Sequence, residues 1–178
     1  MTATDKQALL DQLHASHERV SKLMRGLTEA QWNFREAPDR WTIAECIEHM
    51  TIVERRILSR VEQKLSEPPE PEKKPLAAGK DQKIPTIIPN RATRVNAPEP
   101  VRPTGAWNPS DLPPHFSETR RRTMEFARAA DQRLREHVFP HIALGEIDCY
   151  QWLLFTVHHG ERHARQIEEI KTHPEYPA

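Results

Sequence analysis

The sequence has few cysteines, no long apolar run and no excess of charge of either sign. Its two cysteines, Cys46 and Cys149, lie far apart and form no CxxC pair, so we predict reduced core thiols in a reducing compartment. No stretch approaches the roughly 20 apolar residues that a bilayer-crossing helix needs, and no membrane partner is expected. Lysine plus arginine and aspartate plus glutamate balance at 26 each. No net positive field therefore exists to attract nucleic acid or an anionic membrane.

A leader segment and a second domain are also not expected. The start, from Met1 to Lys6, has no basic region followed by an apolar run, so we expect no signal peptide and a cytoplasmic protein. A length of 178 residues, with 37% hydrophobic and 29% charged residues, suits one helical domain over 1–178 with a buried core. The local basic run Arg120 to Arg122 is interpreted as a solvated helix face.

Four segments carry apolar residues at three- and four-residue steps, the pattern of amphipathic helices. Thr42, with Glu45 three residues later, predicts a capping box at the start of the second. Asp148 is the predicted N-cap of the fourth, and Pro140 is expected to end the third. No alternating pattern indicates a convincing β-sheet. The predicted helices cover about residues 5–27, 42–65, from 110–115 to 140, and 148–171.

Between the second and third predicted helices lies a proline-rich segment, residues 66–115, which holds twelve of the sixteen prolines. Proline removes a backbone donor and breaks helices. The apolar stretch Ile84 to Pro89 is predicted to be an extended piece packed on the domain, because residues before proline favour extended geometry. Each flank offers only about two helices, so we interpret the segment as a crossover within one domain and not as an interdomain linker. It either covers the pocket as a lid or only wraps around the bundle. The predicted fold is all-α, a four-helix bundle with one long crossover between helices 2 and 3.

Three of the ten histidines, His49, His159 and His163, are predicted to hold one divalent metal ion. His159 and His163 lie four apart in the fourth helix and project from one face, the spacing of helical histidine pairs that chelate a metal. His49 qualifies as third ligand because it lies mid-helix beside the apolar stripe of the second helix, and bundles assemble metal sites from facing helices. Three neutral imidazoles favour zinc, nickel or iron and leave a coordination position open.

The other histidines are not expected to bind this ion. His137 and His141 have the same four-residue spacing but straddle a proline, so they are rejected as a pair. His14 and His17, on the first helix, are expected to be solvated or half-buried. His158 points about 100° away from its neighbour in the proposed pair.

Two glutamates and a cysteine lie close to the proposed ligands in sequence. Glu48 and Glu161 could orient ligands or move protons, but helix geometry turns both away from the direction of their neighbours, which favours surface carboxylates. Cys46, one turn before His49, is interpreted as a core thiol and not as a ligand. An open coordination position argues against a purely structural metal, because an ion there can lower the pKa of bound water or of a bound thiol.

Residues 41–50 read WTIAECIEHM and residues 159–167 read HGERHARQI. They resemble the W-S/T-x-x-E-x-x-x-H-L opening of the second helix and the H-x-x-x-H-x-x-Q-I ending of the last helix in the DinB-like (DinB/YfiT) superfamily, and residues 97–105 resemble the crossover of its DinB_2-type subgroup. The resemblance implies an up-up-down-down bundle, frequent homodimers and a metal site on the same three histidines. Gly160 departs from the pattern, and it either opens room beside the ion or permits a close helix contact.

The resemblance implies a metal-dependent enzyme. Relatives include transferases that join small thiols to electrophiles and thiol-dependent isomerases, so the implied partners are a small thiol and an electrophilic small molecule. Metal-assisted hydrolysis is a second chemistry for the same site. Two alternatives stay open: a stress-associated metal- or ligand-binding or dimeric scaffold protein, and a dimerisation module whose histidines hold no metal.

Overall fold

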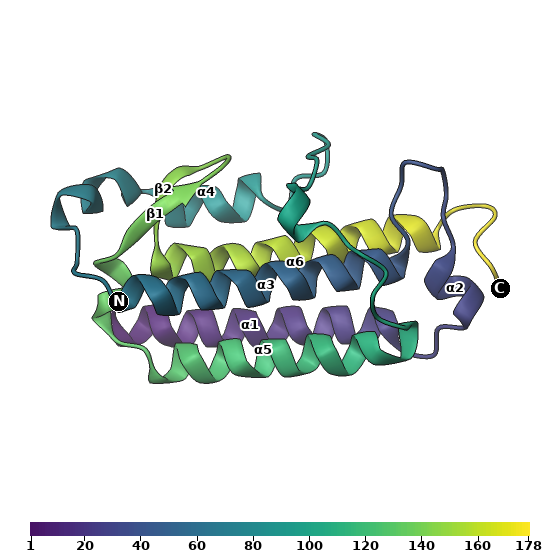
Figure 1. Ribbon diagram of the computed structural model, residues 1–178, viewed down its shortest axis with the longest axis horizontal. Coiled ribbons are helices and arrows are strands. Elements are labelled where there is room, and N and C mark those ends of the chain that lie inside the picture. The colour runs from purple at the N-terminus through teal and green to yellow at the C-terminus, as the bar shows by residue number, and fades with distance from the viewer.

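Four long helices lie side by side and form the body of the molecule (Figure 1). The structure is a computed structural model and describes all 178 residues. The chain is predominantly helical, as predicted, and contains one small two-stranded hairpin. None of the helices has the length and apolar character that crossing a bilayer requires. The long helices are α1 (Ala3–Met24), α3 (Ile43–Leu65), α5 (Leu112–Ala129) and α6 (Cys149–Lys171), and the short α2 (Glu29–Asn33) lies between α1 and α3.

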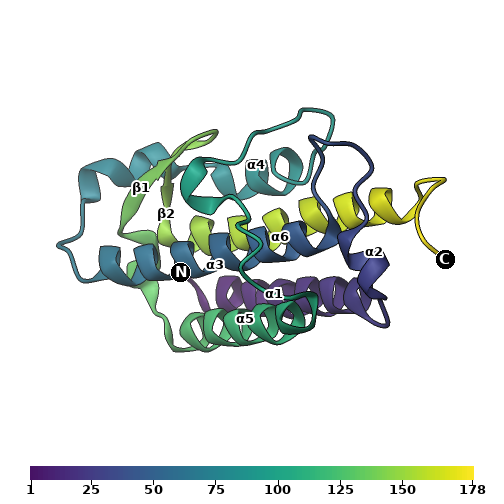
Figure 2. The ribbon, with the colours of Figure 1, turned by 45° about the vertical axis from the view of Figure 1, so that its right-hand side comes forward.

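The helix directions differ from those that the resemblance implies. Arg19, late in α1, pairs with Glu161 in the second half of α6, so these two helices are parallel. Lys6, early in α1, donates to the carbonyl of Arg128 at the end of α5, so these two are antiparallel. In chain order the long helices run up, down, down, up (Figures 1 and 2). The expected up-up-down-down order is wrong. The long crossover carries the chain back to the end of the bundle at which α3 begins, so α5 runs parallel to α3.

Side-chain caps start two helices where the sequence predicts them. Thr42 Oγ1 accepts a hydrogen bond from the Glu45 amide at 3.1 Å, and the Glu45 carboxylate accepts one from the Thr42 amide at 2.8 Å. Asp148 and Gln151 form the same reciprocal pair at the start of α6. Each box satisfies amide groups that have no partner in the first turn of a helix. The predicted starts of α3 and α6 are confirmed.

A buried arginine lies between the two apolar clusters that fill the two ends of the helical body. Arg120 is 1% exposed, and its guanidinium donates to both carboxylate oxygens of Glu54, at 2.8 and 2.9 Å, and to the carbonyl of Leu13. Arg121 and Arg122 are exposed. The interpretation of this run as a solvated face is therefore wrong at Arg120, because a buried carboxylate on another helix compensates its charge.

The crossover contains a short helix that the sequence did not predict. This helix, α4 (Lys80–Ile87), packs along α6, with Ile84 fully buried and Ile88 8% exposed. These two side chains lie one turn apart and are buried together. The free energy gained by burying them outweighs the preference of a residue before proline for an extended backbone. The predicted packing of Ile84 to Pro89 on the domain is therefore confirmed, but its predicted extended geometry is wrong. Three 3₁₀ turns also belong to the crossover: Pro71–Ala77, Glu99–Val101 and Pro109–Asp111.

The third predicted helix is shorter than expected, and a β-hairpin follows it. α5 ends at Ala129, and Ala130 already has extended backbone geometry. Leu134 and Val138 keep a helical spacing but lie in a 3₁₀ turn and a strand, so the predicted extension to Pro140 is wrong. Four-residue hydrophobic steps alone do not distinguish these arrangements in so short a stretch. The added elements are the turn Gln132–Arg135 and the antiparallel strands β1 (Val138–His141) and β2 (Gly145–Asp148).

Gly160 permits a close approach of α6 to α1. A Cβ at this position would lie 2.9 Å from Ser16 Oγ and 3.7 Å from a guanidinium nitrogen of Arg120, with no other atom outside its own helix within 4 Å. Ser16 Oγ is buried and has no hydrogen-bond partner. Of the two roles that the sequence left open for Gly160, close helix contact is the one that the structure supports.

The effect of Gly160→Ala is expected to change sign when Ser16→Ala is also present. Alone, the added methyl meets Ser16 Oγ at 2.9 Å, and an overpacking cost of about 2 kcal/mol exceeds the gain of about 1 kcal/mol in helix propensity. With Ser16→Ala the obstacle is gone, and Gly160→Ala should stabilise the protein by about 1 kcal/mol. Urea unfolding of the four proteins in this double-mutant cycle measures both effects. Equal effects of Gly160→Ala in the two backgrounds would contradict the proposed contact.

Candidate metal centre

The three histidines singled out from the sequence meet at one point between α3 and α6. His159 Nε2 lies 3.2 Å from His49 Nε2 and 3.2 Å from His163 Nε2. His159 and His163 face the same way because they are one turn apart on α6. His49 reaches them from α3, which packs antiparallel beside α6 (Figure 1). One potential ligand atom from each ring therefore belongs to a single compact group.

Hydrogen bonds on the outer nitrogens determine which ring nitrogens carry hydrogen. His49 Nδ1 lies 2.6 Å from the carbonyl oxygen of Val101, which can only accept, so Nδ1 is the donor. His163 Nδ1 lies 2.9 Å from Gln166 Oε1, and this oxygen also accepts from Arg91, which supports its assignment as the oxygen. In the neutral rings of His49 and His163, Nε2 is then unprotonated. Both lone pairs are directed at His159.

The three ligand nitrogens lie within 4.8 Å of one another and could hold a divalent cation. Two nitrogens bound at about 2.1 Å to one ion are roughly 3.0–3.4 Å apart for angles between octahedral and tetrahedral, and the two 3.2 Å separations fall in that range. A single hydrogen on His159 Nε2 can bond to only one of the two lone pairs that face it, those of His49 and His163. A cation can instead bind one nitrogen lone pair from each of the three rings. Ligand histidines commonly donate their other N–H to a carbonyl in this way.

Burial keeps the cluster uncharged. His49 and His163 are buried and His159 is partly exposed, which leaves one accessible side. Burial lowers the pKa of His49, and it lowers the pKa of His159 and His163 well below the usual 6.5, with the neighbouring histidines adding to the effect. At neutral pH the rings are therefore available to a metal without first losing protons.

Aromatic side chains surround the cluster. Trp41 lies with its ring centre 4.7 Å from that of His49 and 5.9 Å from that of His163, and Phe155 stacks on His159 at 5.2 Å. The ring centre of His141 lies 4.7 Å from that of Phe155. An apolar wall of this kind limits access of water to the accessible side of the cluster.

His141 is a neutral hydrogen-bond donor close to this wall. Its Nδ1 accepts from the amides of Ala143 and Leu144 at 3.0 and 3.2 Å, so the hydrogen lies on Nε2. Burial lowers its pKa to about 4. From the sequence, His141 was rejected only as a partner of His137, which lies elsewhere and contacts the carbonyls of Arg133 and Glu67. The hairpin that carries His141 was not predicted, so its position near the cluster was missed.

A known protein superfamily matches most of the chain. The DinB superfamily model matches residues 12–167. The chain belongs to the DinB superfamily. A relative described as the uncharacterized protein YuaE of Bacillus subtilis (strain 168) is 24% identical over 151 residues, which cover 83% of this chain and 88% of that protein.

Other residues considered from the sequence take different places in this DinB superfamily member. Cys46 is a buried core thiol, as predicted. Glu161 pairs with Arg19 on α1 and does not contact the three histidines. His14 is exposed and His17 is half-buried, as expected.

Glu48 is not the surface carboxylate that helix geometry favoured. It is 3% exposed and accepts hydrogen bonds from the crossover, at Thr104 and Gly105. Burial acts to raise its pKa, but these hydrogen bonds outweigh burial, and the pKa is lowered. Glu48 is buried because the crossover supplies donors on a helix face that α3 alone would leave to water.

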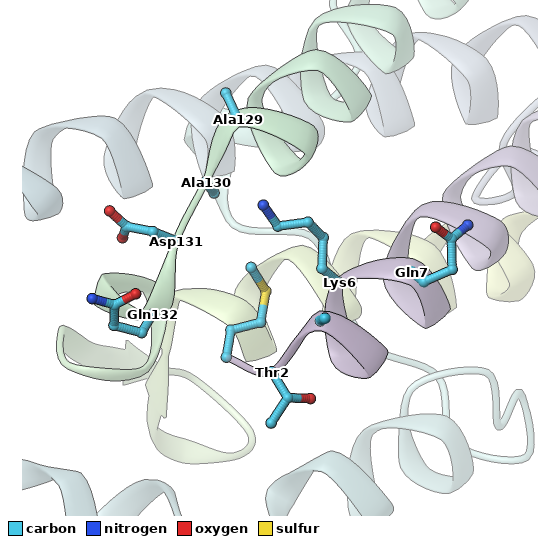
Figure 3. Close-up of a pocket in the computed structure, with 9 residues that line it drawn as sticks. Thr2, Lys6, Gln7, Ala129, Ala130, Asp131 and Gln132 are labelled. Carbon is cyan, nitrogen blue, oxygen red and sulfur yellow. The ribbon is translucent and has the colours of Figure 1, made fainter.

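Two hollows on the surface lie away from the histidine cluster. One of them, between the start of α1 and the end of α5, is lined by Lys6, Gln7 and residues 129–132 (Figure 3). Another is lined by Arg55, Glu62 and Arg122 on α3 and α5. Neither contains a residue of the histidine cluster.

Proposed function

We propose that this protein is a metal-dependent enzyme, built on a DinB-like four-helix bundle, in which His49, His159 and His163 hold one zinc, nickel or iron ion. The observation that carries the proposal is the pair of Nε2 lone pairs directed at His159, at 3.2 Å each. A bound divalent ion would supply Lewis acidity that lowers the pKa of a thiol or water at its open position. We also expect residues 1–178 to act as one domain and to form a homodimer.

The favoured chemistry is transfer of a small thiol to an electrophile. The sulfur of the thiolate forms a bond to the electrophilic carbon, the leaving group departs with its electron pair, and the thiol proton passes to water. The thiol has to come from outside the chain, because burial raises the pKa of Cys149 to about 12 and also raises that of Cys46. The partly exposed His159 and the aromatic wall around Phe155 provide the accessible side where both reactants would meet.

A panel of small thiols with a chromogenic electrophile tests the proposal on metal-loaded, untagged protein. We expect a thiol-dependent rate that falls at least about tenfold in His163→Ala, because that substitution removes one of three ligands. His14→Ala, on the exposed face of α1, should retain the full rate. A rate that His163→Ala leaves unchanged would count against metal-assisted catalysis.

Assays on the same metal-loaded protein distinguish thiol transfer from hydrolysis and from binding without catalysis. Ester hydrolysis by the metal-loaded protein, without a thiol, would assign the site to activation of water. A protein that binds metal but turns over neither substrate class would support the stress-associated metal- or ligand-binding or scaffold role.

A further inference from the structure

The proline-rich crossover contacts the outer nitrogen of one proposed ligand directly and that of a second through a glutamine of α6. On the α3 side, the Val101 carbonyl accepts from His49 Nδ1 at 2.6 Å. On the α6 side, Arg91 donates to Gln166 Oε1 at 3.3 Å, and the same oxygen accepts from His163 Nδ1 at 2.9 Å. Residues 91–101 therefore provide part of the hydrogen-bonded layer that orients both rings.

One buried carboxylate attaches this part of the crossover to α3. Glu48 Oε1 accepts from the amide of Thr104 at 3.0 Å and from its hydroxyl at 2.7 Å, and Oε2 accepts from the amide of Gly105 at 2.9 Å. Glu48 is the residue before His49, and Thr104 is three residues after Val101. The carboxylate thus holds the Val101 carbonyl beside the histidine ring that it orients.

The opposite end of the segment is attached to α6. Arg162, which lies between the two proposed ligands of that helix in sequence, donates to the carbonyl of Thr93 at 2.8 Å and to that of Asn90. Arg91 also binds the Glu169 carboxylate at 2.7 Å. The segment is fastened on both helices that carry ligands, and the histidine cluster lies between the two attachments.

We propose that Glu48 is a positioning residue for the metal centre: it holds the crossover so that the Val101 carbonyl keeps His49 in the Nε2-unprotonated form. Metal binding and attachment of the crossover then stabilise each other, because an ion needs the oriented ring and the oriented ring needs the carbonyl. This inference rests on the proposed metal site and adds to it a role for the crossover.

Zinc affinity of Glu48→Ala, measured by competition with a chromophoric chelator, tests the positioning role. We expect affinity about 10–100-fold weaker than in the wild type, the usual effect of removing support for a ligand. The zinc affinity of Glu48→Gln should lie between those of the wild type and Glu48→Ala. The glutamine amide oxygen still accepts from Thr104, but its NH₂ group faces the Gly105 amide, which cannot accept a hydrogen bond. Glu161→Ala, which removes a carboxylate of α6 that pairs with Arg19, is the matched control and should bind zinc as the wild type does.

Trypsin provides a second readout that does not depend on activity. Arg94 is 55% exposed, and the bond after it lies inside the attached segment, whereas the bond after Arg102 precedes proline and resists trypsin. We expect zinc to slow cleavage after Arg94 in the wild type and to protect Glu48→Ala much less. Thr104→Ala, an exposed change that removes one of the three hydrogen bonds, should shift both readouts in the same direction even if Glu48→Ala folds poorly.

The outcomes separate the two proposals. If the wild type binds none of zinc, nickel and iron(II), the metal site and the positioning role both fail. If the wild type binds zinc and folded Glu48→Ala and Thr104→Ala bind it equally well, with zinc protection of the Arg94 bond unchanged, Glu48 has no positioning role and the metal site stands.

Discussion

Replacing His159 with alanine is expected to weaken zinc binding at least about 100-fold. His159 is the central ring, since both other Nε2 atoms are directed at it, 3.2 Å away. A structural zinc site with a full set of ligands is worth about 10–16 kcal/mol, so each ligand accounts for roughly 3 kcal/mol, which corresponds to about 100-fold in affinity. Metal analysis of untagged protein and chelator competition measure the loss.

His158→Ala is the matched control for this experiment. It removes a neighbouring, half-buried imidazole of the same helix whose Nε2 is buried without a hydrogen-bond partner, outside the three-ring cluster. We expect wild-type zinc affinity in this variant. Zinc should also raise the Tm of the wild type and of His158→Ala but not that of His159→Ala, because only a ligand that binds the folded state stabilises it. Equal zinc affinity in His159→Ala and the wild type would rule out the proposed centre.

Arg120→Met is expected to destabilise the fold by about 3–5 kcal/mol, because it leaves the Glu54 carboxylate buried without its partner. Glu54 is 2% exposed, and both its oxygens accept from Arg120. The Leu13 carbonyl also loses its guanidinium donor. For a chain of this length the change corresponds to a Tm about 10 °C lower. Thermal unfolding followed by circular dichroism measures it.

Two further variants show whether the buried pair is the cause. Arg121→Met, at the next position, removes an exposed arginine that pairs only with glutamates of its own helix, and it should leave the Tm nearly unchanged. Glu54→Leu combined with Arg120→Met should recover most of the lost stability, because no uncompensated charge then remains. A small Tm change in Arg120→Met would mean that water reaches this part of the core.

Local physical chemistry explains what could be predicted from the sequence. The capping boxes at Thr42 and Asp148 and the common face of His159 and His163 depend on residues within one turn of each other. The reduced, buried state of Cys46 and the amphipathic stripes follow from the same short-range patterns. The third histidine followed from the family resemblance as well as from its position beside an apolar stripe, and the family model matches residues 12–167.

The errors lie where short-range patterns carry little information. The segment after α5 was predicted as helix because its apolar steps suit one, yet it forms a turn and a hairpin. Ile84 was expected to be extended because proline follows it, but packing against α6 favours a helix. Arg120 and Glu48 were taken as solvated, because nothing in their own helices shows the groups that meet them.

By itself, then, the sequence determined which four segments contain the long helices, where two of these helices begin, and which face of the last one carries paired imidazoles. Tertiary structure alone decided that His49 lies opposite that pair, that the crossover carbonyl of Val101 sets its tautomer, and that Glu48 and Arg120 are buried. The physical reason is distance along the chain. These contacts join residues that are 52 to 110 positions apart, and their energies depend on partners that no local pattern encodes.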